Sequence, residues 1–492
     1  MERGHYKRDQ VNPSGVADCS VTSSFVLGPR ERALTAAIAL LVLIGCGGVQ
    51  LGSRPTTGPE PTTGAATPPR VATPTPPNDA LDLLRGSGLI AHGAPMPFAG
   101  SVRFLAGKTA DSVVALVGLG IATDALTFRR EGEGNRADYS VTLVLRRGGA
   151  LVATLAASEP VRVATIREAS RLDESVIFQQ AITVAPGEYT LSVSVRDDGS
   201  GKTGTTETAV RVPSFSDGGM TAPIPVYDGA LRASRDSVAR VLVNPRGAAV
   251  YGRDSVLMVY VESYSSSSPR PMEVSALVDG TAVWVDTVPM TGTGVAAGVT
   301  RVPVRRLTPG VATITASPIG DSDATRTTVF VALADEIPVA THADVVSYLQ
   351  YFASPQQLDV LAKASPFGRE AAWAAFIRDT DTIPSTPVNE GLQTYMTRLR
   401  RANQEFREDR PGWRTDRGMV FLLMGEPDGV IDPPMSDVRQ RGRSILWQYL
   451  GMNLVVEFIS TSANQWRLTP ASLAQVRALA SRRTAGGSGP HY

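Results

Sequence analysis

The chain has 492 residues, enough for roughly two to four domains of about 100 to 200 residues each. Charged residues make up 19% of it, with 48 Lys and Arg against 47 Asp and Glu. Because the charges balance, no overall field would hold nucleic acid by counterion release, and we expect no nucleic-acid partner. Four His and two Cys are too few for a zinc or iron–sulfur framework, so we expect no metal and no other cofactor.

A twelve-residue apolar run, Ala33 to Ile44, follows two arginines near the N-terminus. The run is too short for a bilayer-spanning helix of about 20 residues, but it suits the apolar region of a secretion signal. It ends in Leu43-Ile44-Gly45-Cys46, which resembles the lipobox of bacterial lipoproteins. The resemblance implies that residues 1–45 are a signal peptide and that Cys46 carries acyl chains that anchor the protein to a membrane. The alternative is a short anchor helix with an incidental cysteine.

The residues after Cys46 bear on the location. Gly47 and Gly48 follow it, and no Asp is present there. By resemblance to lipoprotein sorting signals, this favours the outer membrane of a cell envelope over the inner membrane. Which face of that membrane the protein occupies stays open.

Residues 46–79 are expected to form a lipidated linker. Between Gly52 and Asp79 the chain has eight Pro and seven Thr, and few apolar side chains that could be buried. Pro-rich segments favour an extended helix that rises about 3.1 Å per residue, so this tether could span up to roughly 80 Å.

Residues 80–215 have the pattern of an all-β domain, preceded by a short helix at Ala80–Leu84. Tyr139–Leu145 alternates apolar and polar residues, Gly148-Gly149 follows as a turn, and Ala150–Leu155 continues as a second strand. This pattern predicts a hairpin. The spacing of the other strand candidates is typical of a β-sandwich.

Residues 236–335 repeat this pattern after a linker at 216–235. We therefore expect two immunoglobulin-like β-sandwiches, whether by duplication or by shared hairpin chemistry. A disordered tail is expected at 481–492, which is rich in Gly, Ser and Arg.

Residues 336–480 are expected to form an α+β domain, in which helices come first and a small antiparallel meander follows. The longest helix should run from Val388 to Glu408, with Thr386 as its N-cap and Pro387 at its first position. Strands are predicted at Met419–Met424, Ile445–Tyr449 and Leu454–Ile459, with a fourth candidate at Trp466–Leu468. The fold class is thus mainly β, with an α+β C-terminal domain.

Two short motifs stand out in this last domain. The first is Gly412-Trp413-Arg414-Thr415-Asp416-Arg417-Gly418, and the second is Gly425-Glu426-Pro427-Asp428. Together they resemble the GWxTD domain of bacterial proteins, a module of uncharacterised function, over about the last 130 residues. Phe421 and Met424 stand where the family has tyrosines, so the resemblance implies no role for a tyrosine hydroxyl here.

The motif residues have a structural interpretation. Gly412 permits an unusual backbone turn, Trp413 supplies a large buried anchor, and Thr415 with Asp416 can bond backbone amides before a strand begins. Pro427, at the second position of Glu426-Pro427-Asp428-Gly429, fits a type I turn.

The functional alternative is an acidic cluster. Asp416, Glu426 and Asp428 could converge to bind a cation or to act as general acid and base. No His, Cys or Lys lies nearby in the sequence, so we expect the structural role and a non-enzymatic protein. That protein would present the module to a protein or glycan partner, and the alternative is an envelope hydrolase. The geometry discriminates between them: carboxylates that line one cleft favour the enzyme, whereas carboxylates that bond backbone amides do not.

Overall fold

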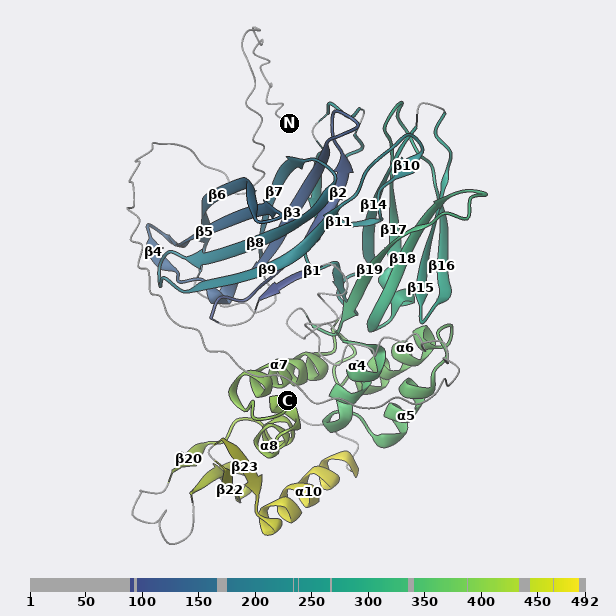
Figure 1. Cartoon of the computed structure of the whole chain (residues 1–492). Coiled ribbons are helices and arrows are strands. Elements are labelled where there is room, and N and C mark those ends of the chain that lie inside the picture. Colours follow the sequence, from purple (N-terminus) through teal and green to yellow (C-terminus); the bar gives the residue numbers. More distant parts are fainter. Residues whose placement is uncertain are drawn as a thin grey trace, which may run out of the picture.

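The computed structural model describes residues 89–92, 95–165, 175–232, 234–237, 239–265, 268–334, 340–386, 388–432, 443–462 and 464–485. Two β-sandwiches precede an α+β domain along the chain, as the sequence predicts (Figure 1). The predicted signal peptide, Cys46, the linker and the helix at Ala80–Leu84 lie outside the described residues.

The first sandwich consists of two sheets. Sheet A has the order β1-β2-β3-β7 and contains β1 (Leu89–His92), β2 (Phe98–Ala106), β3 (Val113–Ala122) and β7 (Ser175–Val184). Sheet B contains β4 (Arg129–Glu131), β5 (Gly134–Arg147), β6 (Ala150–Val163), β8 (Gly187–Asp197) and β9 (Thr203–Val212). A short 3-10 helix, η1 (Thr123–Ala125), follows β3. The apolar faces of the two sheets enclose one core.

The predicted hairpin of the first sandwich is confirmed as β5 and β6. Along β5, buried and half-buried residues alternate, because successive side chains point to opposite faces of the sheet. Gly148 and Gly149 both have positive φ, 54° and 85°, which is the backbone that a tight two-residue hairpin turn requires.

The second sandwich also has two sheets. Sheet C contains β10 (Gly219–Met220), β11 (Ile224–Gly229), β12 (Val241–Val243), β14 (Val256–Tyr264) and β17 (Ala296–Pro303). Sheet D has the order β13-β19-β18-β15-β16, with β13 (Ala248–Val250), β15 (Met272–Val278), β16 (Thr281–Val288), β18 (Gly310–Pro318) and β19 (Thr325–Ala332). A one-turn helix, α3 (Val304–Leu307), connects β17 to β18.

The linker predicted at 216–235 is wrong. These residues include β10 and β11, which pair with β14 and therefore belong to sheet C. Pro225 argues against a strand in the sequence, because proline is rare in the interior of a sheet. In β11, Pro225 pairs opposite Val259, and its carbonyl accepts a hydrogen bond from the Asn244 amide.

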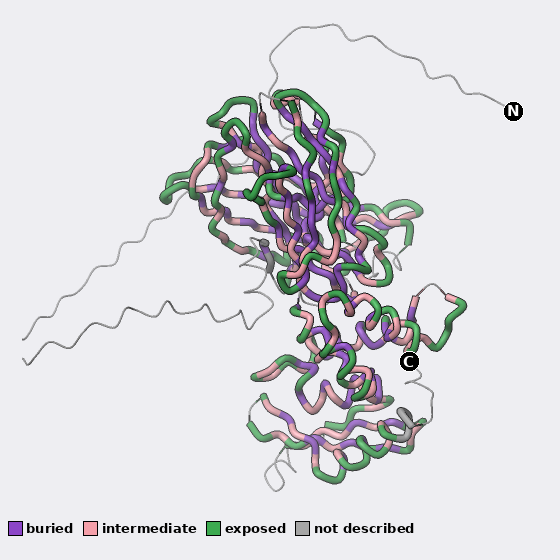
Figure 2. Tube along the Cα trace, turned by 90° about the vertical axis from the view of Figure 1, so that its right-hand side faces the viewer, coloured by how far each residue is buried: buried purple, intermediate pink, exposed green. Residues whose placement is uncertain are grey.

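The four sheets stack in the order B, A, C, D. A small apolar layer joins the outer faces of sheets A and C, and it includes Leu105 and Leu116 from the first sandwich and Val243 and Tyr260 from the second. Figure 2 shows buried residues running through the centre of this stack. The two sandwiches therefore share a packed interface.

A buried ion pair reinforces this interface. Arg232 lies 2.8 Å from Glu262, and both side chains are almost completely buried. Arg232 also donates to the carbonyl of Ala106 in β2, and the Ala106 amide donates to the Tyr264 hydroxyl. Tyr260 and Tyr264 both donate to the Glu262 carboxylate. The network thus connects β2 of one sandwich to β14 of the other.

The α+β domain begins with helices and ends with a four-stranded antiparallel meander, sheet E. Its helices are α4 (His342–Tyr348), η2 (Leu349–Tyr351), α5 (Pro355–Lys363), α6 (Arg369–Thr380), α7 (Glu390–Glu405), η3 (Gly412–Arg414), α8 (Asp416–Met424), η4 (Leu450–Met452) and α10 (Pro470–Ala485). Sheet E has the order β20 (Gly429–Ile431), β21 (Ser444–Tyr449), β22 (Leu454–Ser462) and β23 (Gln465–Leu468).

The helices differ from the prediction at two places, the start of α7 and the unpredicted helix α10. The N-cap of α7 is Asn389 and not Thr386, because the Asn389 side chain accepts from the Leu392 amide. Helix α10 extends to Ala485, into the segment predicted as a tail. Thr469 caps its start, because the Thr469 hydroxyl accepts from the Ser472 amide at 3.4 Å. The Ser472 hydroxyl accepts from the Glu457 amide and so attaches the helix to β22.

The α+β domain also contacts both sandwiches. Arg369 at the start of α6 forms a 2.6 Å ion pair with Asp279 of the second sandwich. Trp373, which is fully buried, contacts the ring of Tyr251 in the second sandwich, with centroids 6.0 Å apart. Helix α7 reaches the first sandwich, where Arg400 lies 3.5 Å from Asp124 of η1.

Candidate functional site

The first motif forms η3 and the start of α8, so the strand predicted at Met419–Met424 is wrong. This six-residue apolar run has no periodicity that separates a buried strand from a buried helix. Thr415 decides the outcome, because its hydroxyl accepts from the Gly418 amide at 3.1 Å and caps the helix. Gly425 then ends α8 with a φ of 87°.

Two glycines of the motif allow close backbone contacts. A Cβ at Gly412 would overlap the carbonyl oxygen of Ala402 in α7. A Cβ at Gly418 would overlap the carbonyl oxygen of Gly412 itself. Because no side chain fits at either position, the two glycines bring η3 and α8 directly onto α7.

Trp413 also holds η3 against α7 and the neighbouring residues. It is 3% exposed, and its ring meets that of Tyr348 edge-on at 5.4 Å. Its amide donates to the side chain of Asn403 at 3.2 Å. The Arg414 guanidinium carbon lies 4.7 Å from the Trp413 ring centre, in a cation–π contact.

Thr415 and Asp416 connect the motif to its surroundings. The Thr415 hydroxyl donates to the Gly412 carbonyl at 2.7 Å, in addition to its capping bond. Asp416 accepts from the Leu468 amide of β23 at 2.8 Å and lies 3.6 Å from Arg410. Asp416 therefore fastens the first turn of α8 to sheet E, a role consistent with the structural expectation.

The second motif forms the connection from α8 to β20. Glu426 accepts two hydrogen bonds from Arg401 of α7, at 3.0 and 3.3 Å, and these bonds lower the pKa of the Glu426 carboxyl. Asp428 accepts from the Leu450 amide at 2.6 Å. The Tyr449 hydroxyl donates to the Gly425 carbonyl at 3.1 Å.

Each of the three candidate carboxylates thus has its own structural partner. Asp416 and Asp428 bond backbone amides, whereas Glu426 pairs with an arginine. In the part of the chain that the structure describes, no group of three or more His, Cys, Asp or Glu is arranged to hold a metal ion. All three carboxylates are therefore engaged in bonds within the domain.

No pattern in the sequence indicates Glu408, a carboxylate that contacts two arginines and a backbone amide. Its side chain is fully buried and lies 3.3 Å from both Arg417 and Arg467. It also accepts from the Trp466 amide. Glu408 stands in the charged run Arg407-Glu408-Asp409-Arg410, a pattern typical of a solvated loop, so no sequence signal marks it.

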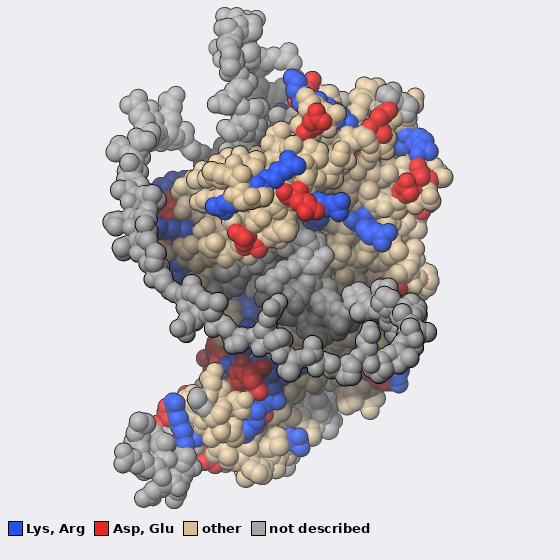
Figure 3. All heavy atoms as spheres, in the orientation of Figure 1, with Lys and Arg blue, Asp and Glu red and all other residues tan. Residues whose placement is uncertain are grey.

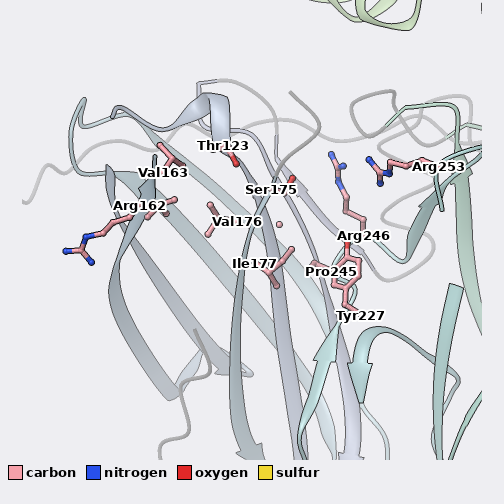
Figure 4. A pocket seen from close by; sticks show the side chains of 12 residues that line it. Thr123, Arg162, Val163, Ser175, Val176, Ile177, Tyr227, Pro245, Arg246 and Arg253 are labelled. Carbon is pink, nitrogen blue, oxygen red and sulfur yellow. The ribbon is translucent and has the colours of Figure 1, made fainter. Parts of the chain in front are cut away.

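A cleft lies beside the interface between the sandwiches, with a volume of about 470 Å³. Val176 and Ile177 line it from the first sandwich, and Tyr227, Arg246 and Arg253 line it from the second (Figure 4).

The basic residues of this cleft are partly neutralised. Arg162 directs its guanidinium away from the other labelled side chains and pairs with Glu131, while Arg253 pairs with Asp254. On the face seen in Figure 3, basic and acidic side chains are interspersed in the same way. Within the described residues, no helix is both long and apolar enough to cross a bilayer.

These features define a protein of two stacked β-sandwiches that hold a C-terminal α+β module. Residues 319–464 match the family model of the GWxTD domain, so the chain contains a GWxTD domain, as the two motifs predict. The match begins in the second sandwich, ahead of β19, and ends between β22 and β23.

Other comparisons add little to this result. No curated protein matches the chain. Among solved structures, tandem immunoglobulin domains of titin share 12% identity with it, over 50% of this chain and 97% of theirs, with a TM-score of 0.13. The strand pairings described above, and not this likeness, define the two sandwiches.

Proposed function

We propose that the protein is a lipid-anchored binding or scaffolding protein of the cell envelope, which presents its GWxTD domain to a protein or glycan partner. Acyl chains on Cys46 would attach it to the outer membrane, and residues 46–79 would form the tether. The contacts between neighbouring domains support this role, because they hold the GWxTD domain in a fixed orientation on the two sandwiches.

One observation carries the non-enzymatic part of the proposal. Asp416, Glu426 and Asp428 are each bound within the domain, and together with Gly412 and Thr415 they fix how α7, α8 and sheet E meet. A general acid or base must instead reach the proton it transfers in a bound substrate. The motif residues therefore support a role in building the domain. The hydrolase alternative would need these bonds to break.

The anchor is tested by mass spectrometry of the native N-terminus. We expect a chain that begins at Cys46 and carries diacylglyceryl on its sulfur, and we expect Cys46→Ser to leave the membrane fraction. An unprocessed N-terminus with an unmodified Cys46 would overturn the envelope role.

The hydrolase alternative is tested separately. The triple variant Asp416→Asn, Glu426→Gln, Asp428→Asn should still recover the partner of the wild-type protein. The side-chain amide oxygens of Asn and Gln can still accept the hydrogen bonds that the three carboxylates accept. Loss of a hydrolytic activity on envelope material, with the fold retained by circular dichroism, would favour the enzyme instead.

A further inference from the structure

His342 lies at the contact between the second sandwich and the α+β domain. It is the first residue of α4, and its side chain is half-buried. Its Nδ1 lies 3.1 Å from the carbonyl oxygen of Pro309, in the connection between α3 and β18. Its Nε2 lies 3.1 Å from the carbonyl oxygen of Leu361 in α5. The imidazole therefore bridges the two domains.

Both partners of the His342 ring are hydrogen-bond acceptors. A neutral imidazole has one N–H and one bare nitrogen, so it can donate to only one of the two carbonyls. Its bare nitrogen would then face the other carbonyl oxygen, and two acceptors form no hydrogen bond. An imidazolium has an N–H on each nitrogen and can donate to both carbonyls. The surroundings of His342 thus match the protonated ring.

The two helices at His342 act in opposite directions on a charged ring. Leu361 belongs to the last turn of α5, where the carbonyls form the negative end of the helix dipole and favour a cation. The N-terminus of α4 disfavours a cation, although Asp344 adds a negative charge to its first turn. Hydrogen bonds from a charged donor contribute more to stability than a helix dipole does, so the two carbonyls decide in favour of the charged ring.

The backbone confines the ring between its two partners. A Cβ at Gly310 would lie 3.0 Å from the His342 amide nitrogen, so β18 and α4 are in close contact. Thr308, just before Pro309, has a φ of 55°, which is a strained conformation for a residue other than glycine. Such strain is often found in switch regions. On the other side, the ring of Trp373 meets the imidazole edge-on at 6.0 Å.

We propose that His342 is a pH-dependent clamp between the second sandwich and the α+β domain. The protonated ring donates to Pro309 and Leu361, and so holds α4 and α5 against the sandwich. When the ring loses its proton, one of the two bonds is lost and these helices loosen. The contact of Trp373 with Tyr251 remains, so the domain stays attached.

The clamp has a consequence for the proposed function, although it does not depend on that function. If the GWxTD domain is presented to a partner, the pH would set how rigidly the domain is held. Loss of the clamp would therefore change the orientation of the domain and leave its membrane anchor intact.

The other charged groups on the elements around His342 are Asp344 on α4 and a set of paired residues on α3, α5 and α6. The pairs are Lys363 with Asp359, Arg369 with Asp279, Arg378 with Asp379, and Glu370 with Arg305 and Arg306. Burial raises the pKa of Tyr251, which contacts Trp373, to about 12. Histidine is the side-chain type that ordinarily titrates between about pH 5 and pH 8, so we assign an effect in this range to His342.

Hydrogen exchange of the backbone amides tests the clamp in the full chain carrying Cys46→Ser. Relative to an unstructured peptide at the same pH, the amides of α4 and α5 should exchange about tenfold more slowly at about pH 5 than at about pH 8, because the bond that is lost has a charged donor. His342→Gln cannot be protonated and should remove this pH dependence. His92→Gln is the matched control, because it removes a histidine from β1 of the first sandwich, and it should retain the pH dependence.

Each outcome of these experiments decides the question. Equal protection of α4 and α5 at both pH values, or a pH dependence that persists in His342→Gln, would overturn the proposal. Nitrogen NMR of the histidine rings is a second measurement, and with only four His in the chain the His342→Gln spectrum assigns His342. Both ring nitrogens should carry protons at about pH 5, and one should have lost its proton at about pH 8. A ring that is neutral at the lower pH, or doubly protonated at the higher, would contradict the switch.

Discussion

Gly412 lies so close to α7 that any side chain would displace the helix. Gly412→Ala should lower the free energy of unfolding by about 3 kcal/mol or more, because the overlap is with the Ala402 carbonyl of the backbone, which cannot move aside. Gly451→Ala is the matched control, since nothing lies within 4 Å of a Cβ there. Urea denaturation measures both. Equal stability of the two variants would show that the close approach does not hold the domain together.

Substitution of Glu408 provides a second test at the scale of single residues. Glu408→Gln should cost about 3 to 5 kcal/mol, because Arg417 would keep a charge that is mostly buried and has lost its ion pair. Glu405→Gln, which removes an exposed pair with Arg401, should cost less than about 1 kcal/mol. Similar midpoints in urea for both variants would contradict this ranking.

Residue roles were partly foreseeable from the sequence. Trp413 as a buried anchor and Thr415 as a partner of nearby amides follow from the chemistry of those side chains. Glu408 does not, because its burial depends on Arg467 and Trp466, which come more than fifty residues later and approach it only in the folded chain.

At the scale of elements, Thr415 starts α8. Thr415→Ala should destabilise the protein by about 1 to 2 kcal/mol, whereas Thr415→Ser should be close to wild type because it keeps the capping hydroxyl. Thermal unfolding of the two variants makes the comparison. An alanine variant as stable as the serine variant would assign the start of α8 to packing alone.

Strands were predicted more reliably than this helix. The period-two pattern of β5 and the double glycine after it determine a hairpin locally. The segment from Met419 to Met424 carries no such local information, since an apolar run of six residues fits either element. Pro225 favoured the opposite error, in which a strand is predicted as a linker. The sheet accommodates this proline because its carbonyl accepts a hydrogen bond from the Asn244 amide, and the amide hydrogen that proline lacks is not needed there.

At the scale of the whole molecule, buried tyrosines couple stability to alkaline pH. Burial raises the pKa of Tyr251 to about 12, and the negative charge of Glu370 adds to this. Burial, with Glu262 adding, also raises the pKa of Tyr260 and Tyr264 at the interface of the sandwiches. A tyrosine in the unfolded chain loses its proton near pH 10.

The sign follows from proton binding. Above about pH 10 the folded state holds more protons than the unfolded state. The stability that the buried tyrosines contribute is therefore fully present below that pH and is lost as the pH rises. The tyrosinate absorbance of these buried tyrosines should therefore appear together with the loss of circular dichroism. A smooth titration of all the tyrosines near pH 10 with the fold intact would contradict this.

The domain arrangement was predictable only in outline. Two sandwiches and an α+β domain follow from the order of the strand and helix patterns. The stacking of sheets A and C depends on contacts such as Arg232 with Glu262, and no pattern within one segment specifies a contact between domains.

Crosslinked isolation of the lipidated chain from native membranes tests the proposed role most directly. The wild-type chain and Glu426→Gln should both recover the same partner at a fixed stoichiometry, while unlipidated Cys46→Ser should recover it poorly. If the folded, membrane-bound wild-type chain recovers no stoichiometric protein or glycan, presentation of the GWxTD domain to a partner is contradicted.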